Sequence, residues 1–233
     1  MIGAVEICQP AYPPGHSADE LRLSRSDRST RSAPSLRDES FFLPFHEVNQ
    51  RCIELLVEAA KIQRRTTQGL VSDLHDLLQS ISPLERRRAA QRAFLLVDLQ
   101  LGDIQRWAGA GAAKDSHVPR LATAHVYFPR AQATRLARAT LTLAWHSVRS
   151  DQRNAHVLLG MTEPVAEAIS RLRFEDIDRI AERRCKYIRP RWSDRPAIWR
   201  EILSGSSEPS QRDANLHGVQ LITGELLARQ TAG

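Results

Sequence analysis

The sequence predicts an all-α fold with a helical corner of helix-turn-helix proportions and at most one or two short strands. After residue 40, apolar residues recur at steps of three and four, which is the spacing of one face of an α-helix. Ser82 followed by Pro83 marks a helix start, because a proline in the first turn loses no helical hydrogen bond. The stretches whose pattern would suit a strand are short and few.

Residues 1–40 predict a disordered N-terminal arm. Four prolines stand among serines and paired charges, and no helical or strand period persists. The arginines of this arm are matched by nearby acids, which makes it a poor anchor for nucleic acid. We therefore expect a solvated tail.

Residues 41–108 predict an N-terminal helical half. One helix is expected from residue 41 to about residue 65, a second over 70–81, and a third from Pro83 towards Phe94. The run at 94–98, Phe-Leu-Leu-Val-Asp, fits either a buried strand or the apolar end of the third helix, and periodicity does not decide so short a run.

Residues 109–123 predict a linker before the C-terminal helical domain, residues 124–233. Gly109 and Gly111 lack the strand and helix that would surround a nucleotide-binding loop, so we interpret them as a flexible connection. The domain is expected to open with a short strand at 124–128 and a long helix that continues to about residue 148.

The helical corner is expected from two short amphipathic helices in close succession. Thr162 can cap the first, and its apolar stripe ends at Leu172. A second stripe runs from Phe174 to Ala181, so the chain must turn sharply between them. A final helix over 216–227 completes the domain.

A basic segment follows the corner directly. Guanidinium and ammonium groups can neutralise phosphates and release counterions, which gives affinity with little sequence information. The second helix of the corner carries acids that would repel a duplex, so we expect it to be a poor reader of the major groove. The candidate DNA-binding residues are Arg183, Arg184, Lys186, Arg189, Arg191 and Arg195. The chain's net charge of +6 agrees with an anionic partner, although an arginine bias equally reflects a GC-rich genome.

Two tryptophans accompany the basic charge. Tryptophan and arginine are enriched at binding hot spots, so Trp192 and Trp199 predict a partner-binding surface; the alternative is that they anchor the segment to the core. Pro190 and Pro196 favour a partly extended path here. The final helix adds three candidate partner-binding residues: Leu216, Val219 and Leu226.

The order and spacing of residues from about Thr134 to Gln230 resemble the FlhD family, subunits of the flagellar master transcriptional activator. The resemblance rests on LTLAWHSVRSDQRNA, HVLLGMTEPVAEAISRLRFEDIDRIAER and LHGVQLITGELLA. It implies an all-α, dimeric fold and activation of transcription with an FlhC-like partner, which in that family supplies the zinc site and much of the DNA contact.

The sequence also departs from the family. A family cysteine falls near Ile188, whereas Cys185 lies three residues earlier, so no intersubunit disulfide is carried over. The arginine content after the corner is heavier than the family implies, which favours more direct contact with DNA.

The first half resembles a distant copy of the second. Setting each residue against the one 91 positions later pairs Leu78 with Ile169, Arg88 with Arg179 and Val97 with Ile188. With one residue inserted in the second half, the offset becomes 92 and Trp107 pairs with Trp199. Two amphipathic helices can align at some offset by chance, so the hypothesis requires the same order of helices in both halves. A repeat would let one chain fold as a pseudo-symmetric pair.

No catalytic or metal-binding motif is present. The histidines are scattered without an HExxH, CxxC or GxSxG context, and we expect no enzyme activity, no metal and no cofactor. Cys8, Cys52 and Cys185 are widely separated, which indicates reduced thiols. No apolar run is long enough for a membrane helix. We therefore expect a cytoplasmic, bacterial, FlhD-like transcriptional regulator that binds DNA within a complex, formed with an FlhC-like partner or as a homo-oligomer. The alternative is a helical adaptor that binds protein but not DNA.

Overall fold

The computed structural model describes residues 39–62, 69–107, 127–204 and 210–231. All of them belong to one compact unit, Asp38–Gly233. Apart from its last two residues, the expected arm lies outside the described residues, as do the whole expected linker and most of the expected strand at 124–128.

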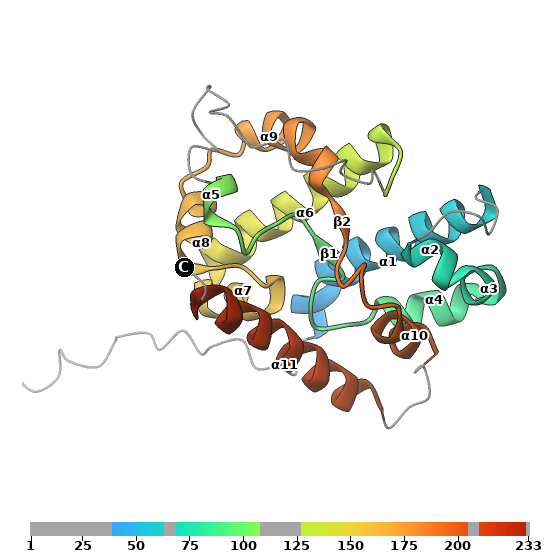
Figure 1. Cartoon of the computed structure of the whole chain (residues 1–233). Coiled ribbons are helices and arrows are strands. Elements are labelled where there is room, and N and C mark those ends of the chain that lie inside the picture. The colour runs from blue at the N-terminus through green and yellow to red at the C-terminus, as the bar shows by residue number, and fades with distance from the viewer. Residues whose placement is uncertain (1–38, 63–68, 108–126, 205–209, 232–233) are drawn as a thin grey trace, which may run out of the picture. The chain divides into compact units, whose positions relative to one another are not determined.

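The first half contains four helices, a short strand and a further helical turn (Figure 1). They are α1 (Glu39–Ile62), α2 (Leu70–Asp73), α3 (His75–Ser80), α4 (Pro83–Ala90), β1 (Val97–Asp98) and α5 (Ile104–Trp107).

The second half begins with a long helix and a helical corner and ends with two further helices. Its elements are α6 (Arg130–Ser150), α7 (Gln152–Leu159), α8 (Glu163–Ser170), α9 (Asp176–Arg184), the 3₁₀ turn η2 (Cys185–Tyr187), β2 (Arg189–Pro190), α10 (Pro196–Ser204) and α11 (Ser210–Thr231). The expectation of an all-α fold is confirmed, since β1 and β2 form only a two-stranded antiparallel pair among the described residues.

Helix starts follow the local sequence. The Ser82 hydroxyl accepts the Glu85 N–H at 3.3 Å, and the Glu85 carboxylate accepts the Ser82 N–H at 2.7 Å, which is a complete capping box. These bonds from Ser82 lower the pKa of Glu85. Thr162 does occupy the N-cap position of α8, but its hydroxyl makes no capping bond.

Several boundaries differ from expectation. The helix expected over 70–81 is broken at Leu74 into α2 and α3, and α4 ends at Ala90 instead of continuing to Phe94. Of the run at 94–98, only Val97 and Asp98 are strand. Tyr127 and Phe128 are not part of a strand.

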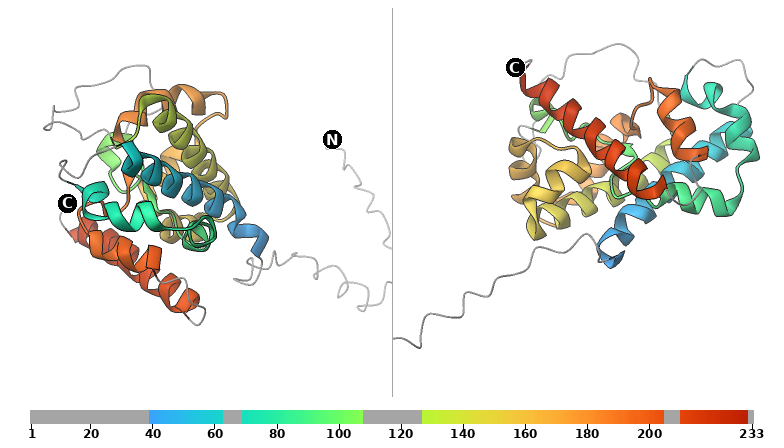
Figure 2. Two further views of the ribbon diagram at one scale, coloured as in Figure 1. Left: turned by 90° about the vertical axis from the view of Figure 1, so that its right-hand side faces the viewer. Right: turned by 90° about the horizontal axis from the view of Figure 1, so that it is seen from below.

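A single hydrophobic core draws on both halves. The long helix α6 packs on α7, α8 and α9 of its own half and on α1 of the first half. Figure 2 shows α1 and α6 side by side. Trp107 and Trp199, one from each half, are fully buried in this core. The halves therefore do not form separate cores.

Both halves present their elements in the same order. A long helix comes first in each, followed by a corner, a two-residue strand and a helix; the second half then continues into α11, which has no counterpart in the described part of the first half. The first residues of α1, α4, β1 and α5 precede those of α6, α9, β2 and α10 by 91 to 93 positions. At this offset, α7 falls mainly on residues outside the described part of the first half. This shared order is what the repeat hypothesis requires.

The helix that follows the strand in each half packs on the other half. Helix α5, which follows β1, packs on α8 of the second half, whereas α10, which follows β2, packs on α4 of the first half. Hydrogen bonds support both crossings, because Thr162 N–H donates to the Leu101 carbonyl at 3.3 Å and the Arg92 guanidinium, just after α4, donates to the Ile202 carbonyl of α10 at 3.1 Å.

Candidate nucleic-acid interface

The basic segment, defined as residues 183–195, crosses from the end of α9 through η2 and β2 to the start of α10. Four of its six candidate residues are exposed: Arg183, Lys186, Arg189 and Arg195. Arg183 and Arg195 form no ion pair with the described acids. The other two candidates, Arg184 and Arg191, have structural contacts that sequence reasoning did not anticipate.

Arg191 is buried, which corrects the expectation that it contacts phosphate. Its side chain is 6% exposed, and Nη2 donates to the Leu159 carbonyl at 2.6 Å. That carbonyl lies in the last turn of α7, where carbonyls lack helical partners and a cation is favoured. Gly160 ends α7 in the left-handed conformation with φ 63° and leaves space for the guanidinium. Arg191 therefore fastens β2 to the end of α7.

Arg184 is partly exposed and stacks on a core tryptophan, a structural contact that the sequence did not predict. Its guanidinium lies 4.2 Å from the centre of the Trp107 ring and donates to the Arg106 carbonyl. A cation over an indole face is an attractive arrangement. Arg184 therefore joins α9 to α5.

At the same junction, two cations lie over the ring of Tyr187. Arg106 lies 5.1 Å and Lys186 4.9 Å from the centre of the Tyr187 ring. Arg106 also bonds Asp103 at 2.9 Å, whereas Lys186 remains exposed. Sequence reasoning missed Arg106 and Tyr187, because only the fold brings α5 against η2.

Arg189 is half-exposed and paired with Asp98. Its Nε and Nη2 atoms lie 3.1 and 3.0 Å from Asp98 Oδ2, and the two residues face each other across the β1–β2 ladder. Its availability to an external phosphate is therefore reduced by a partner of opposite charge.

The second helix of the corner, α9, carries acids on its outer surface. Glu175 and Asp178 are exposed, and each forms an ion pair at 2.6 Å, with Arg173 and Arg138 respectively. Asp176 is less exposed, and hydrogen bonds from Arg173 and Arg179 lower its pKa. This distribution of charge supports the interpretation that α9 is poorly suited to reading a major groove.

Trp192 and Trp199 are buried, so their expected role as exposed partner contacts is corrected. Trp192 packs edge-on against Phe94, and its Nε1 donates to Glu225 at 2.6 Å. Trp199 Nε1 donates to the Arg191 carbonyl at 2.6 Å. Both tryptophans anchor the chain to the core, as the alternative interpretation held.

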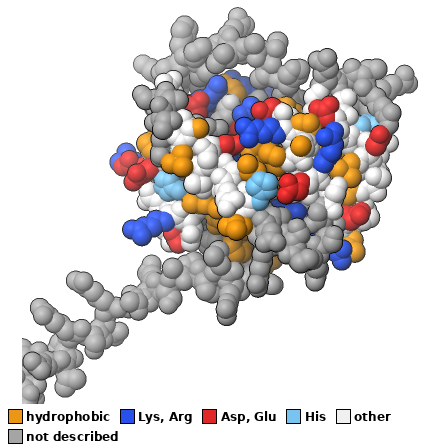
Figure 3. All heavy atoms as spheres, turned by 60° about the horizontal axis from the view of Figure 1, so that its bottom comes forward, with side chains coloured by type: hydrophobic (Ala, Val, Ile, Leu, Met, Phe, Trp, Pro, Cys, Tyr) orange, Lys and Arg blue, Asp and Glu red, His pale blue; other side chains and the backbone are white. Residues whose placement is uncertain are grey.

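Helix α11 carries the remaining partner-binding candidates. Leu216 is 59% exposed, whereas Val219 and Leu226 are partly buried against the core. In Figure 3, the face that includes α11 shows hydrophobic, basic and acidic side chains interspersed. We find no extended area of a single charge on this face.

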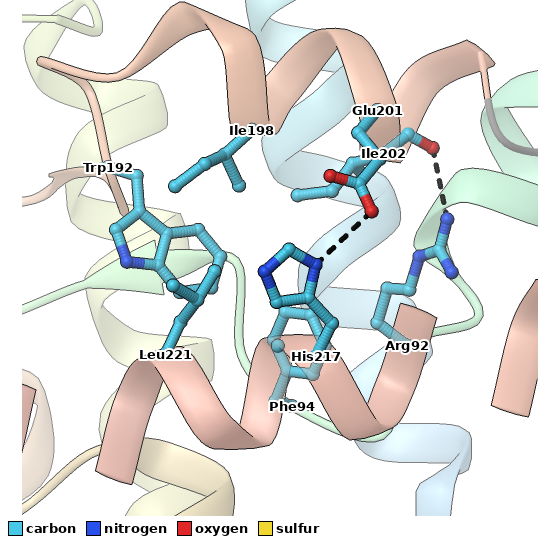
Figure 4. A pocket seen from close by; sticks show the side chains of 9 residues that line it. Arg92, Phe94, Trp192, Ile198, Glu201, Ile202, His217 and Leu221 are labelled. Atoms are coloured by element: carbon cyan, nitrogen blue, oxygen red, sulfur yellow. Dashed lines mark hydrogen bonds and ion pairs between the residues drawn. The ribbon is translucent and has the colours of Figure 1, made fainter. Parts of the chain in front are cut away.

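A small hollow lies beneath α11 (Figure 4). Phe94, Trp192 and Leu221 supply apolar walls, and His217 Nδ1 lies 3.3 Å from Glu201 Oε1 at the exposed side. The Arg92 guanidinium donates to the Ile202 carbonyl at 3.1 Å, so it serves the packing of α10.

The two described cysteines are buried free thiols. Burial raises the pKa of the Cys52 thiol, and a protonated buried thiol is a poor nucleophile. Cys185 Sγ donates to the Glu182 carbonyl at 3.1 Å.

Comparison with known protein families, curated proteins and solved structures finds no match to this chain. Within the described part of the chain, no three His, Cys, Asp or Glu side chains are grouped so as to hold a metal ion. The same residues include no helix that is long and apolar enough to cross a membrane.

Proposed function

We propose that this protein is an FlhD-like subunit of a DNA-binding transcriptional regulator and that exposed cations of its basic segment contact the DNA backbone. The observation that carries this proposal is the exposure of Arg183, Lys186 and Arg195 on one continuous segment whose other arginines are held by the fold. A rigid support for exposed cations favours phosphate contacts, because the register of the charges is set before binding.

The chemistry of these contacts supports affinity more than sequence selectivity. Phosphate contacts position a protein on the duplex, whereas base contacts specify the sequence. The acids on α9 disfavour base reading by the corner. An FlhC-like partner would therefore supply sequence recognition, as the family resemblance implies.

The test uses the full chain and a fluorescently labelled mixed-sequence DNA duplex. A triple Arg183→Ala, Lys186→Ala, Arg195→Ala variant should bind the duplex at least tenfold more weakly, about 1.4 kcal/mol or more, because three phosphate contacts are lost. Arg189 is kept, since its removal would also leave Asp98 without its partner. Fluorescence anisotropy measures the affinity.

A matched control removes equal charge elsewhere. Arg87, Arg88 and Arg153 are exposed and lie outside the basic segment, so replacing all three by alanine should weaken binding much less. Equal losses in both triple variants would show that only net charge matters, and the assignment of the segment would then be wrong.

A second function, that of a protein-binding adaptor, is favoured by exposed apolar side chains. Phe174 is 61% exposed at the corner and lies 5.7 Å from the ring of Trp145, and Leu216 and Leu227 are exposed on α11. Absence of any duplex binding by the wild-type chain, together with loss of a purified protein partner on Phe174→Ser substitution, would support the adaptor over the DNA-binding subunit.

A further inference from the structure

The turns that follow β1 and β2 correspond to each other at an offset of 92 residues. Gln100 and Trp192 are the non-glycine residues with positive φ in the described chain, with values of 58° and 53°. Each accepts at its carbonyl the N–H of the residue three positions later, at 3.1 and 2.9 Å respectively. Trp107 and Trp199, also 92 positions apart, are both fully buried. This offset therefore relates the two halves in the region that follows their strands.

At the same offset, the surface beneath α11 has a charged counterpart. The hollow of Figure 4 is lined by three large apolar side chains: Phe94, Trp192 and Ile198. The residues at the corresponding positions are polar or charged: Lys186, Gln100 and Arg106. One surface thus accepts the chain's own helix through apolar contacts, whereas its counterpart carries two cations in place of apolar side chains.

The two surfaces share one supporting contact. Arg92 and Arg184 are 92 positions apart, and each donates to a carbonyl of the helix that packs across from the other half. Arg92 bonds Ile202 of α10, and Arg184 bonds Arg106 of α5. The framework is therefore similar at both places, and the side chains around it determine what each surface can bind.

The charged counterpart, which we call the α5–η2 junction, consists of Arg106, Arg184, Lys186 and Tyr187. Arg106 and Lys186 lie 5.1 and 4.9 Å from the centre of the Tyr187 ring. The two charges are therefore within about 10 Å of each other, about the Debye length at 0.1 M salt, so solvent screens their repulsion only in part. Asp103 pairs with Arg106 at 2.9 Å, whereas Lys186 has no ion pair with a described acid.

An anion at this junction would offset the repulsion between its cations. Lys186 is exposed, Arg184 and Tyr187 are partly exposed, and the Arg106 side chain is 19% exposed. The exposed Arg183 immediately precedes Arg184 in the chain. A phosphate oxygen accepts charge-assisted hydrogen bonds from guanidinium and ammonium groups, and these are stronger than neutral ones.

We propose that the α5–η2 junction binds a backbone phosphate of duplex DNA, with Arg106 of the first half acting beside Lys186 of the second. This inference rests on the proposed function and extends the DNA-contacting surface from the basic segment onto α5. The ring of Tyr187 holds the two cations side by side, so the site exists only because the fold brings the halves together.

The test compares two arginines that each pair with an aspartate, in the full chain. Arg106→Gln should lower the magnitude of the salt slope of duplex binding by about 1, because one phosphate contact is lost. Arg138→Gln removes the same charge from the pair with Asp178 and should leave the slope nearly unchanged. Arg106→Lys should keep the wild-type slope. Fluorescence anisotropy of the labelled mixed-sequence duplex at a series of salt concentrations measures all four proteins.

A complementary substitution removes the acid of the junction. Asp103→Asn should tighten duplex binding about threefold, as expected for the loss of one exposed charge–charge repulsion. Asp178→Asn is the matched control, because Asp178 is also an exposed aspartate paired with an arginine, and it should have a smaller effect.

The outcomes separate this inference from the proposed function. Equal slopes for Arg106→Gln and Arg138→Gln, when the Arg183, Lys186, Arg195 triple variant does lower the slope, would overturn the junction and leave the basic segment as the DNA contact. Absence of duplex binding by the wild type would overturn both. Circular dichroism checks that Arg106→Gln is folded. If it is not, the acid substitutions decide, and equal effects of Asp103→Asn and Asp178→Asn would overturn the junction.

Discussion

Asn49 shows how one buried polar side chain joins three segments. It lies on α1 with no exposed surface, and its amide donates to the carbonyls of Ala90 at 3.3 Å and Phe94 at 2.8 Å. Its Oδ1 accepts the Leu96 N–H at 2.8 Å. These bonds satisfy the irregular backbone between α4 and β1, which has no helical partners.

Asn49→Ala should lower the free energy of unfolding by about 3 kcal/mol, because it leaves the Phe94 carbonyl and the Leu96 amide buried without this partner. Urea unfolding measures the change. Gln50→Ala, one position along the same helix, removes only a bond to Glu54 and should change stability by about 0.5 kcal/mol or less. Similar effects of the two substitutions would contradict the role of Asn49.

Gly160 and Arg191 form a second residue-scale unit. A methyl group at position 160 would overlap the Arg191 guanidinium, and the left-handed backbone disfavours any side chain. Gly160→Ala should therefore cost about 2 kcal/mol or more of unfolding free energy.

A double-mutant cycle separates the two causes. In an Arg191→Ala background, the cost of Gly160→Ala should fall to about 1 kcal/mol, because only the backbone strain remains. A cost that does not change between the two backgrounds would show that Arg191 does not occupy the space beside Gly160.

At the scale of elements, the corner has a pH-dependent contribution to stability. Hydrogen bonds from Arg173 and Arg179 lower the pKa of Asp176 in the folded state. A lowered folded-state pKa stabilises the fold above the ordinary carboxyl pKa of about 4, and this contribution is lost as the pH falls through the folded value.

Asp176→Asn should therefore reduce stability at neutral pH and weaken the loss of stability on acidification. Thermal unfolding at a series of pH values measures both, and Asp178→Asn corrects for the change in net charge. A steeper acid dependence in Asp176→Asn than in wild type would contradict the direction of the pKa shift.

The packing of helix α11 on the core depends on the close approach of its backbone at Gly218 to Phe94. Gly218 lies against the Phe94 ring, where a methyl group would overlap it, whereas Gly224 on the same helix has open space. Gly218→Ala should loosen α11 and speed amide hydrogen exchange over this helix. Gly224→Ala should slow exchange there, because alanine favours a helix by about 1 kcal/mol over glycine. Equal protection in both variants would mean that α11 does not depend on contact with Phe94.

Elements with strong local signals could be predicted from the sequence, and elements set by tertiary contacts could not. The capping box at Ser82 and Glu85 and the prolines near helix starts act locally, so the starts of α4 and α8 were predictable. The break at Leu74 and the end of α4 at Ala90 depend on packing and on Asn49, which no local pattern reveals.

The candidate site was predictable as a segment but not residue by residue. The excess of positive charge after the corner is a property of the sequence, and four of its cations are exposed. Arg184 contacts Trp107 and Arg191 contacts the Leu159 carbonyl, and both partners are distant in sequence. Long-range contacts of this kind have no local signature.

At the scale of the whole molecule, one core and helices that pack across the two halves hold the basic segment in place. The segment lies between α9 and α10, which pack on different halves, and β2 at its centre pairs with β1. Tertiary contacts thus give the exposed cations a defined support. We propose that Arg183, Lys186 and Arg195 use this support to contact DNA phosphates.

The salt dependence of duplex binding tests this claim most directly. The slope of log affinity against log salt concentration is about −0.9 per neutralised phosphate, so the triple alanine variant should show a slope smaller in magnitude by about 3 than wild type. The variant lacking Arg87, Arg88 and Arg153 should keep nearly the wild-type slope. The same slope for wild type and for the Arg183, Lys186, Arg195 variant would contradict the claim.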